Sequence, residues 1–241
     1  MKVALISHTP NPDLICAAAA RTTIKREGAE EALRNLDAEG AAKTLRRVMG
    51  RGHLSVVEHA SFTFAIDGIS RACSHQLVRH RHASYTQQSQ RYVKIDNEAF
   101  PYVTPPSMKG KHREKFEKII RSLAREYRYF LDEGIPAEDA RYILPNATCT
   151  NIVVTMNARE LLNFFGLRCC MRAQWEIREL ANRMLAEVKK VAPVIFENAW
   201  ARCKELGYCP EGEPDCAYPP KGEATSRSLG PRRKQSSGKE G

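Results

Sequence analysis

The chain has 241 residues, of which 42% are hydrophobic and 27% are charged, and its formal net charge is +10. This balance is typical of an ordinary globular chain, and the length suits one substantial core or at most two small ones. The sequence contains no apolar run near the roughly 18 residues that a membrane-spanning helix needs. Its first residues also lack the extended apolar region of a signal peptide. We therefore expect a cytoplasmic protein that has no membrane partner.

Part of the positive charge lies in a tail over residues 219–241. Six basic residues there stand against two acidic ones, so the tail accounts for +4 of the +10. The tail is rich in Pro, Gly and Ser and has almost no apolar residues, which is typical of a disordered segment. We predict one folded domain over residues 1–218, which is only mildly basic, followed by this disordered basic tail.

The pattern of apolar residues predicts a mixed α/β chain with few strands and several helices. In chain order we expect a strand over residues 3–7, helices over 13–24, 30–36 and 41–49, a strand over 62–66 that Gly68 ends, a helix from 70 towards 81, a loop over 101–106, a long amphipathic helix over 116–131, a strand over 150–156, and helices over 159–167 and 174–191. Helical character continues to about residue 204.

Eight cysteines are spread over the chain, and none forms a C-x-x-C pair. The first five lie in apolar or helical contexts, which predicts plain core residues. Cys203, Cys209 and Cys216 lie close together near the end, where a metal site or a disulfide is conceivable. Their spacing fits no strong metal or disulfide pattern, so we predict no metal site.

Positions 68 to 95 contain no Asp or Glu. The segment is instead rich in basic side chains, namely Arg71, His75, Arg79, His80, Arg81, His82, Arg91 and Lys94. Hydroxyl and amide side chains fill much of residues 84–90. Guanidinium groups without counter-ions repel each other, and a bound anion is the usual reason for such a cluster. The alternative is a solvated basic face at the end of a helix.

Helical geometry favours a functional role for this basic segment. If the helix continues to residue 81, Arg81 follows Leu77 by four residues and lies on the apolar stripe. Arg79 would then point to the opposite side. Because a guanidinium in a buried seam needs a partner, we expect a ligand or a second subunit beside Arg81.

Three other polar fragments point to a ligand. Residues 52–59 hold two histidines, a serine and a carboxylate, but not the H-E-x-x-H pattern of zinc proteases. Asn157, Arg159 and Asn163 lie at the start of a predicted helix, where free backbone N–H groups suit a polar ligand. Arg168 closes that helix, where it could bind a ligand or only complement the helix dipole.

The run Arg79-His80-Arg81-x-x-Ser84-x4-Ser89-x-Arg91 resembles the signature of flavin-dependent thymidylate synthases. Further segments resemble blocks of that family in the family's order, so that the similarity covers about residues 20 to 200. These segments are Gly52-His53 through Glu58-His59, Phe62-Thr63-Phe64, Gln76, residues 141–145, Asn157-Ala158-Arg159, Asn163-Phe164 and residues 168–176.

The resemblance implies an α/β (α+β) fold with a small, mostly antiparallel central sheet flanked by several helices. It implies the reductive methylation of dUMP to dTMP, with methylenetetrahydrofolate as carbon donor, NADPH as reductant and a bound FAD. It also implies a homotetramer with sites shared between subunits, which would place a partner beside Arg81. In that chemistry the substrate and flavin need no cysteine nucleophile, and the basic segment from 79 to 91 contains no cysteine.

The resemblance also assigns individual residues. The flavin-binding positions that it implies are Ser55, Glu58, Arg79, His80, Arg81, Gln87, Asn157, Ala158, Arg159 and Asn163. The dUMP-binding positions that it implies are Gln76, Leu77, Val78, Arg79, Gln87, Gln88, Ser89, Gln90, Arg91, Arg141 and Arg168. Arg168 matches the arginine that activates the uracil ring, since a nearby guanidinium favours the deprotonated imide and moves electron density towards the carbon to be methylated.

The chain departs from the family pattern at three places. Thr86-Gln87 replaces an Asn-Glu pair of many relatives, Arg172 stands where a relative has His, and Thr23 keeps the hydroxyl of a more usual serine. A nucleic-acid-binding protein is a rival prediction, but only Tyr85 and Tyr92 interleave with the basic residues as such a module requires. An inactive homologue is a third, which the intact arginines disfavour.

Overall fold

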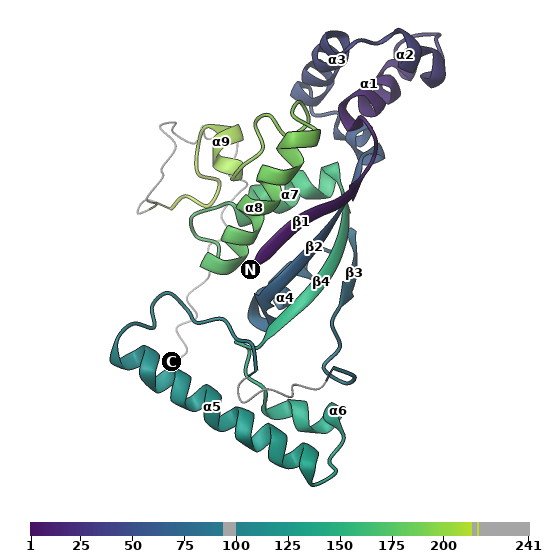
Figure 1. Ribbon diagram of the computed structural model, residues 1–241. Helices are drawn as coiled ribbons and strands as arrows, with labels where there is room; N and C mark the ends of the chain where they lie inside the picture. Colours follow the sequence, from purple (N-terminus) through teal and green to yellow (C-terminus); the bar gives the residue numbers. More distant parts are fainter. Residues whose placement is uncertain (94–99, 214–215, 217–241) are drawn as a thin grey trace, which may run out of the picture.

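The computed structural model describes residues 1–93, 100–213 and 216 (Figure 1). The predicted disordered tail lies outside the described residues. In the described part, a four-stranded sheet has the strand order β1-β2-β4-β3, and every neighbouring pair is antiparallel. The strands are β1 (Lys2–His8), β2 (Ser61–Ser70), β3 (Ala83–Gln87) and β4 (Cys149–Asn157). The predicted small antiparallel sheet among several helices is confirmed.

One face of the sheet carries the main hydrophobic core. Phe62, Phe64 and Ile66 of β2 are fully buried, and they pair in register with buried residues of β4. Two helices cover this face, α7 (Ala158–Arg168) and α8 (Trp175–Val191). The alternation of apolar and polar residues in β2 and β4 therefore separates the core from the opposite face, as expected for a half-buried strand.

A bulge extends β2 beyond its predicted end. The prediction that Gly68 ends the strand is wrong, because β2 continues to Ser70 and pairs with β4 on both sides of the glycine. Gly68 has a φ of +71° and the register shifts between Ile66 and Ile69. The extra residue of a bulge changes which side chains face inward. Ile69 and Ser70 are thereby both buried at the start of the next helix.

The predicted helix from 70 towards 81 is shorter than expected. Helix α4 ends at Leu77, and a turn over residues 78–82 leads into β3. The placement of Arg81 on a buried helical seam is therefore wrong, and its side chain is exposed. The strand was not predicted because Ser84 and Thr86 leave it without an apolar face of its own. Its pairing with β4 supplies the hydrogen bonds that a longer helix would have made.

The N-terminal helices pack together at one end of the sheet (Figure 1). They are α1 (Pro12–Thr22), α2 (Ala29–Asn35), α3 (Ala38–Gly50) and the 3-10 helix η1 (Leu54–His59). All three predicted helices are present within a few residues of their expected bounds. The Asp13 carboxylate accepts hydrogen bonds from the backbone N–H groups of Val194 and Ile195, at 3.0 and 3.1 Å. These contacts tie the start of α1 to the segment after α8.

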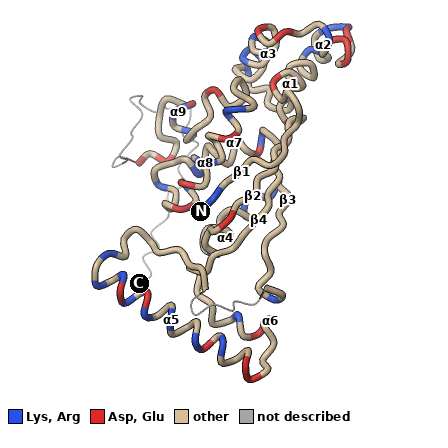
Figure 2. Tube along the Cα trace, in the orientation of Figure 1, with Lys and Arg blue, Asp and Glu red and all other residues tan. Residues whose placement is uncertain are grey.

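A helical arm extends from the opposite end of the sheet (Figure 1). It contains α5 (Lys111–Asp132), α6 (Ala137–Ala140) and the 3-10 helix η2 (Arg141–Ile143). Figure 2 shows acidic and basic residues mixed along α5. The arm has a small core of its own around Phe100 and Ile120. The predicted long helix is confirmed.

The last described helix is α9 (Arg202–Leu206), and it is separate from α8. Helical structure therefore does not continue without interruption to residue 204. A search of the helices in residues 1–93, 100–213 and 216 finds no candidate for a membrane span.

Candidate functional site

The start of α4 is fixed by a buried carboxylate. Glu176 of α8 is only 2% exposed, and it accepts hydrogen bonds from the backbone N–H and the hydroxyl of Ser70, at 2.7 and 2.5 Å. The Ser70 oxygen in turn accepts the backbone N–H of Cys73 at 3.0 Å and so caps the helix. The bulged end of β2, α4 and α8 are therefore joined where the basic segment begins.

The turn after α4 is fixed from β3. The Tyr85 hydroxyl lies 2.9 Å from the carbonyl oxygen of Leu77 and 2.8 Å from that of His80. Burial, and to a lesser degree the Glu160 carboxylate, raise the pKa of Tyr85, so this hydroxyl keeps its proton and remains a donor. Arg79 and Arg81 stand on this turn with exposed side chains. Two backbone carbonyls of the turn are thus held from β3, while its two arginine residues are exposed.

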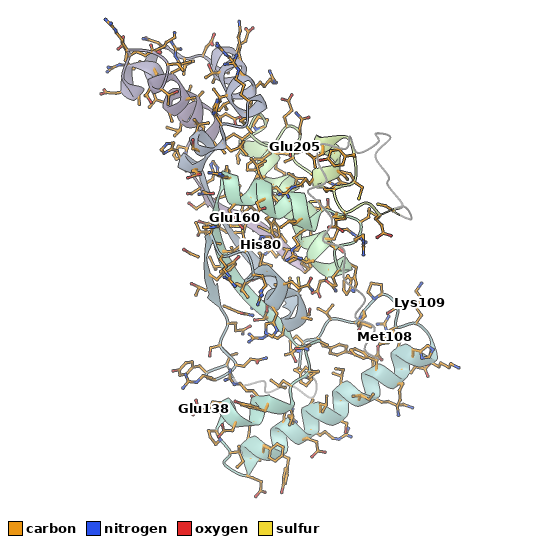
Figure 3. All side chains as sticks on the ribbon, turned by 180° about the vertical axis from the view of Figure 1, so that it is seen from behind. His80, Met108, Lys109, Glu138, Glu160 and Glu205 are labelled. Carbon is orange, nitrogen blue, oxygen red and sulfur yellow. The ribbon has the colours of Figure 1, made fainter. Side chains whose placement is uncertain are left out.

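The side chain of His80 points inward and is 5% exposed. Its Nδ1 lies 3.2 Å from Oε1 of Glu160, and its Nε2 lies 3.0 Å from Nε of Arg168. Figure 3 shows His80 and Glu160 beside each other. Burial, together with the Arg168 charge, lowers the pKa of His80 against the opposing effect of Glu160. The imidazole is therefore neutral at physiological pH.

A large cavity of about 1000 Å³ opens beside this cluster. Four of the predicted flavin positions line it, namely Glu58, Asn157, Arg159 and Asn163. Asn157 caps α7 by accepting the backbone N–H of Glu160 at 2.9 Å, and Glu58 is ion-paired with Arg159. The fold thus brings η1 and the start of α7 together around a polar cavity, although their residues lie about a hundred positions apart in sequence.

The other predicted flavin positions do not line the cavity. Ser55 is exposed on η1, Ala158 is buried, and Arg79 and Arg81 stand on the turn after α4. The Gln87 amide donates to the hydroxyls of two neighbours, Ser74 at 2.9 Å and Thr150 at 3.2 Å. In this chain Gln87 therefore ties β3 to α4 and β4, a role that the Glu of many relatives could perform only as an acceptor.

Two predicted dUMP positions meet at the arm. Nε of Arg91 donates to the Glu138 carboxylate at 2.8 Å, and Nε of Arg141 donates to the Glu138 backbone carbonyl at 3.0 Å. Ser89 lies beside them, because its hydroxyl oxygen accepts the backbone N–H of Arg91 at 3.2 Å. Figure 3 shows Glu138 at the arm, away from His80. The arm therefore gathers two arginines and a hydroxyl from segments fifty residues apart.

The remaining dUMP positions surround α4 and the strand after it. Gln76 donates weakly to the Ala72 carbonyl at 3.5 Å, and the backbone N–H of Gln88 donates to the Asn151 carbonyl at 2.9 Å. Leu77 is buried, Val78 is exposed and Gln90 is half-buried.

The sequence analysis assigned no site role to three residues of the site, namely Arg71, Tyr85 and Glu160. Burial, and to a lesser degree the nearby charge of Arg141, lower the pKa of Arg71. It therefore adds a third guanidinium beside the arm. Its place in the carboxylate-free segment was a signal for it. Glu160 gave no such signal, because an acidic residue in the first turn of a helix is usually explained by the helix dipole.

Each of the cysteines is free. Cys16, Cys73 and Cys169 are buried, and burial is the main reason why the pKa of Cys16 rises to about 12. Cys203, Cys209 and Cys216 line a small cavity of about 160 Å³ together with Cys170 and Arg172. In the part of the chain that the structure describes, a search for three or more His, Cys, Asp or Glu side chains that could hold a metal ion finds none.

The remaining departures from the family pattern have internal partners. Arg172 forms ion pairs with Glu213 and, at 3.6 Å, with Glu211. The Thr23 hydroxyl donates to the Ala20 carbonyl at 2.8 Å. In this structure both side chains stabilise local segments.

The structure thus combines guanidinium groups gathered at the arm with a separate large cavity, an arrangement that suits an anion and a second ligand. Residues 4–194 match the family described as "Thymidylate synthase complementing protein". A flavin-dependent thymidylate synthase of Geobacter sulfurreducens is 55% identical over 218 residues, covering 90% of this chain and 94% of the relative. One from Pyrococcus furiosus is 46% identical over 222 residues, covering 88% and 90%.

The fold agrees with these sequence relatives. A crystal structure of the UMP/dUMP methylase PolB from Streptomyces cacaoi, bound with 5-Br dUMP, is similar with a TM-score of 0.71 and 29% identity. The similarity covers 83% of this chain and 96% of that one. The chain belongs to the family of flavin-dependent thymidylate synthases, and it is an enzyme.

Proposed function

We propose that this enzyme methylates dUMP to dTMP, with methylenetetrahydrofolate as carbon donor, NADPH as reductant and a bound FAD. Family membership supports the reaction, and the similar methylase structure holds a dUMP analogue. The observation that carries the proposal is the position of Arg168, whose guanidinium stands at the end of α7 with its Nε held by a buried histidine.

The arm supplies groups for the phosphate of dUMP. Arg71, Arg91 and Arg141 lie at or beside it, together with the hydroxyl of Ser89. A guanidinium can donate two parallel hydrogen bonds to a phosphate, and such charge-assisted bonds are roughly twice as strong as neutral ones. Because Arg91 is now paired with Glu138, a phosphate would compete with that carboxylate for it.

The cavity suits the flavin. Its volume of about 1000 Å³ is at the upper end of what ligand pockets span, roughly 300–1,000 Å³. Its lining supplies both hydrogen-bond donors and acceptors from Glu58, Arg159 and the amides of Asn157 and Asn163. When bound, the flavin supplies the redox chemistry that reduces the transferred carbon. These four side chains would hold and orient it.

Arg168 would act on the uracil ring. A guanidinium beside the ring lowers the pKa of the imide and so raises the electron density at the carbon that receives the one-carbon unit. No thiol nucleophile is needed for this step. In agreement, Cys73 is buried, and burial is the first cause that raises its pKa.

We also propose that the enzyme is a homotetramer with shared sites. Ser55, Arg79 and Arg81 are predicted flavin positions, and each is exposed outside the cavity of the single chain. A neighbouring subunit would bring a second cavity to these side chains. Light scattering of the purified protein tests this, and a monomer with full activity would contradict it.

The reaction is tested on the purified protein. We expect a flavin absorption spectrum at about one chromophore per chain, and dTMP formation that requires dUMP, methylenetetrahydrofolate and NADPH together. A colourless protein that FAD cannot reconstitute would overturn the proposal. Binding of single-stranded nucleic acid with no flavin would instead support the rival prediction.

A further inference from the structure

Three residues of α7 form a stripe on one face of the helix. Glu160, Phe164 and Arg168 follow each other at intervals of four, and residues four apart lie one above the other. The stripe extends for about 12 Å at 1.5 Å per residue. The ring of His80 lies across it, with its centroid 4.9 Å from that of Phe164 and the ring planes at 84°.

The hydrogen bonds determine where the imidazole carries its proton. Arginine has only donors, so the Nε of Arg168 can approach Nε2 of His80 at 3.0 Å only if Nε2 is an unprotonated acceptor. The proton of the neutral ring is therefore on Nδ1, which donates to the Glu160 carboxylate at 3.2 Å. Hydrogen bonds thus connect the Glu160 carboxylate to the neutral imidazole of His80, and that imidazole to the Arg168 guanidinium.

Burial makes this arrangement costly unless every partner is kept. Glu160 is 6% exposed, and an unpaired charge at such a depth would be strongly unfavourable. Its position in the first turn of α7 provides some compensation from the helix dipole. The hydrogen bond to His80 gives the carboxylate a direct partner.

The terminal nitrogens of Arg168 remain available. Within residues 1–93, 100–213 and 216, Nε is the only nitrogen of Arg168 that donates a hydrogen bond. The residue is half-buried, so part of it is accessible. Holding Nε leaves the other two nitrogens pointing in a fixed direction as a pair.

We propose that Glu160 is a positioning residue that acts through His80 to hold the Arg168 guanidinium in one orientation. The inference rests on the proposed function, in which Arg168 activates the uracil ring. Glu160 also lines the cavity assigned to the flavin. One buried chain of hydrogen bonds thereby connects the wall of the flavin cavity to the arginine that acts on the nucleotide.

The central experiment compares Glu160→Gln with the unmodified enzyme over a range of pH. A glutamine keeps the size of the side chain but removes the charge. We expect kcat to fall by about 10- to 100-fold, since small misplacements of a catalytic group have effects of this order. We expect the KM for dUMP to change little, because the phosphate contacts at the arm are untouched.

The fall in activity at acid pH, the acid limb of the pH profile, distinguishes a positioning role of Glu160 from a general loss of structure. Protonated His80 cannot accept from Arg168, so activity should fall as His80 takes up a proton. The titratable and charged groups around His80 are Glu160 and Arg168 on α7 and Tyr85 on β3. Because the Glu160 charge raises the pKa of His80, Glu160→Gln should move the acid limb to lower pH. An unmoved limb, or an unchanged kcat, would overturn the inference.

Glu176→Gln is the matched control, since it neutralises the other buried carboxylate of the site without touching His80. It should lower stability and leave the position of the acid limb unchanged. If Glu160→Gln does not fold, nitrogen NMR of the unmodified, histidine-labelled enzyme decides alone, with His80→Gln assigning the signal. We expect the proton on Nδ1, and a proton on Nε2 would contradict the inference.

Arg168→Ala separates this inference from the proposed function. Full dTMP formation by Arg168→Ala would remove the role of the arginine itself. Loss of activity in Arg168→Ala with wild-type kinetics in Glu160→Gln would leave the proposed function standing and remove only the positioning role.

Discussion

In the part of the chain that the structure describes, two buried carboxylates occupy similar places and serve different ends. Glu160 is 6% exposed and Glu176 is 2% exposed, and each lies in the first turn of a helix that covers the sheet. Glu176 holds Ser70 at the start of α4, and Glu160 holds His80 in the turn after its end. Together they fix both ends of the segment that carries the basic signature.

The difference lies in the partner. Ser70 presents a neutral hydroxyl and a backbone N–H, and its hydrogen bonds end in the cap of a helix. His80 presents a ring with a second nitrogen, which passes the constraint on to Arg168. A buried carboxylate at the start of a helix can therefore either fix a backbone segment or orient a charged side chain. Which of these it does depends on what the partner contacts in turn, a backbone N–H in the case of Ser70 and a guanidinium in the case of His80.

The largest effect is expected at Arg168, where the series of hydrogen bonds that starts at Glu160 ends. Arg168→Ala should lower the rate of dTMP formation by about 100- to 1,000-fold, as does removal of one group that stabilises developing charge. Flavin content should be largely retained, since Arg168 does not line the cavity. Steady-state assays and absorption spectra measure both. Loss of the flavin alone would mean that Arg168 belongs to the cofactor site.

The hydrogen bonds that connect Glu176 to Ser70 should matter more for folding than for catalysis. Glu176→Ala leaves the buried Ser70 groups without their acceptor, so the free energy of unfolding should fall by about 3 kcal/mol. Urea unfolding at a fixed protein concentration measures this, because assembly would make stability depend on concentration. A stability equal to that of the unmodified protein would show that solvent or another group replaces the carboxylate.

The pH dependence of stability sharpens the comparison further. The lowered pKa of His80 means that the unfolded chain takes up a proton before the folded one does. Stability should therefore be lost as the pH falls below the ordinary histidine pKa of about 6.5. This loss continues down to the lowered pKa of the folded state. His80→Gln should lack that contribution, as urea midpoints between neutral and acid pH will show.

A smaller effect is expected at the hydroxyl that holds the turn. Tyr85→Phe removes one hydrogen-bonding group from the carbonyls of Leu77 and His80, which should lower the free energy of unfolding by about 1 kcal/mol. Urea unfolding tests this. Arg34→Ala, which breaks an exposed pair with Glu30 on α2, is the control and should leave the urea midpoint unchanged.

Much of the fold could be predicted from local patterns. The strands over residues 3–7, 62–66 and 150–156 and the helices on either side of them have periodicities that predict their form directly. Strand β3 could not be predicted, because Ser84 and Thr86 face away from the core and the strand exists through its pairing with β4. The early end of α4 has the same cause, because the residues that follow the helix lead into that strand.

The candidate site was predictable in its residues but not in its connections. Glu58, Asn157, Arg159 and Asn163 were expected to bind one ligand, and the structure places them around one cavity. Arg81 was expected in a buried seam and is exposed. It is His80, the neighbour in the turn, that faces inward.

The sequence by itself determined the basic segment, the family and the composition of the site, because these depend on residue types and on their order along the chain. Only the tertiary structure decided which atoms meet. Glu160 and Arg168 lie 80 and 88 positions from His80, and their hydrogen bonds form only because α7 packs over the sheet beside the end of α4. Local periodicity cannot predict such a contact, because the contact forms only when two separate elements pack against each other.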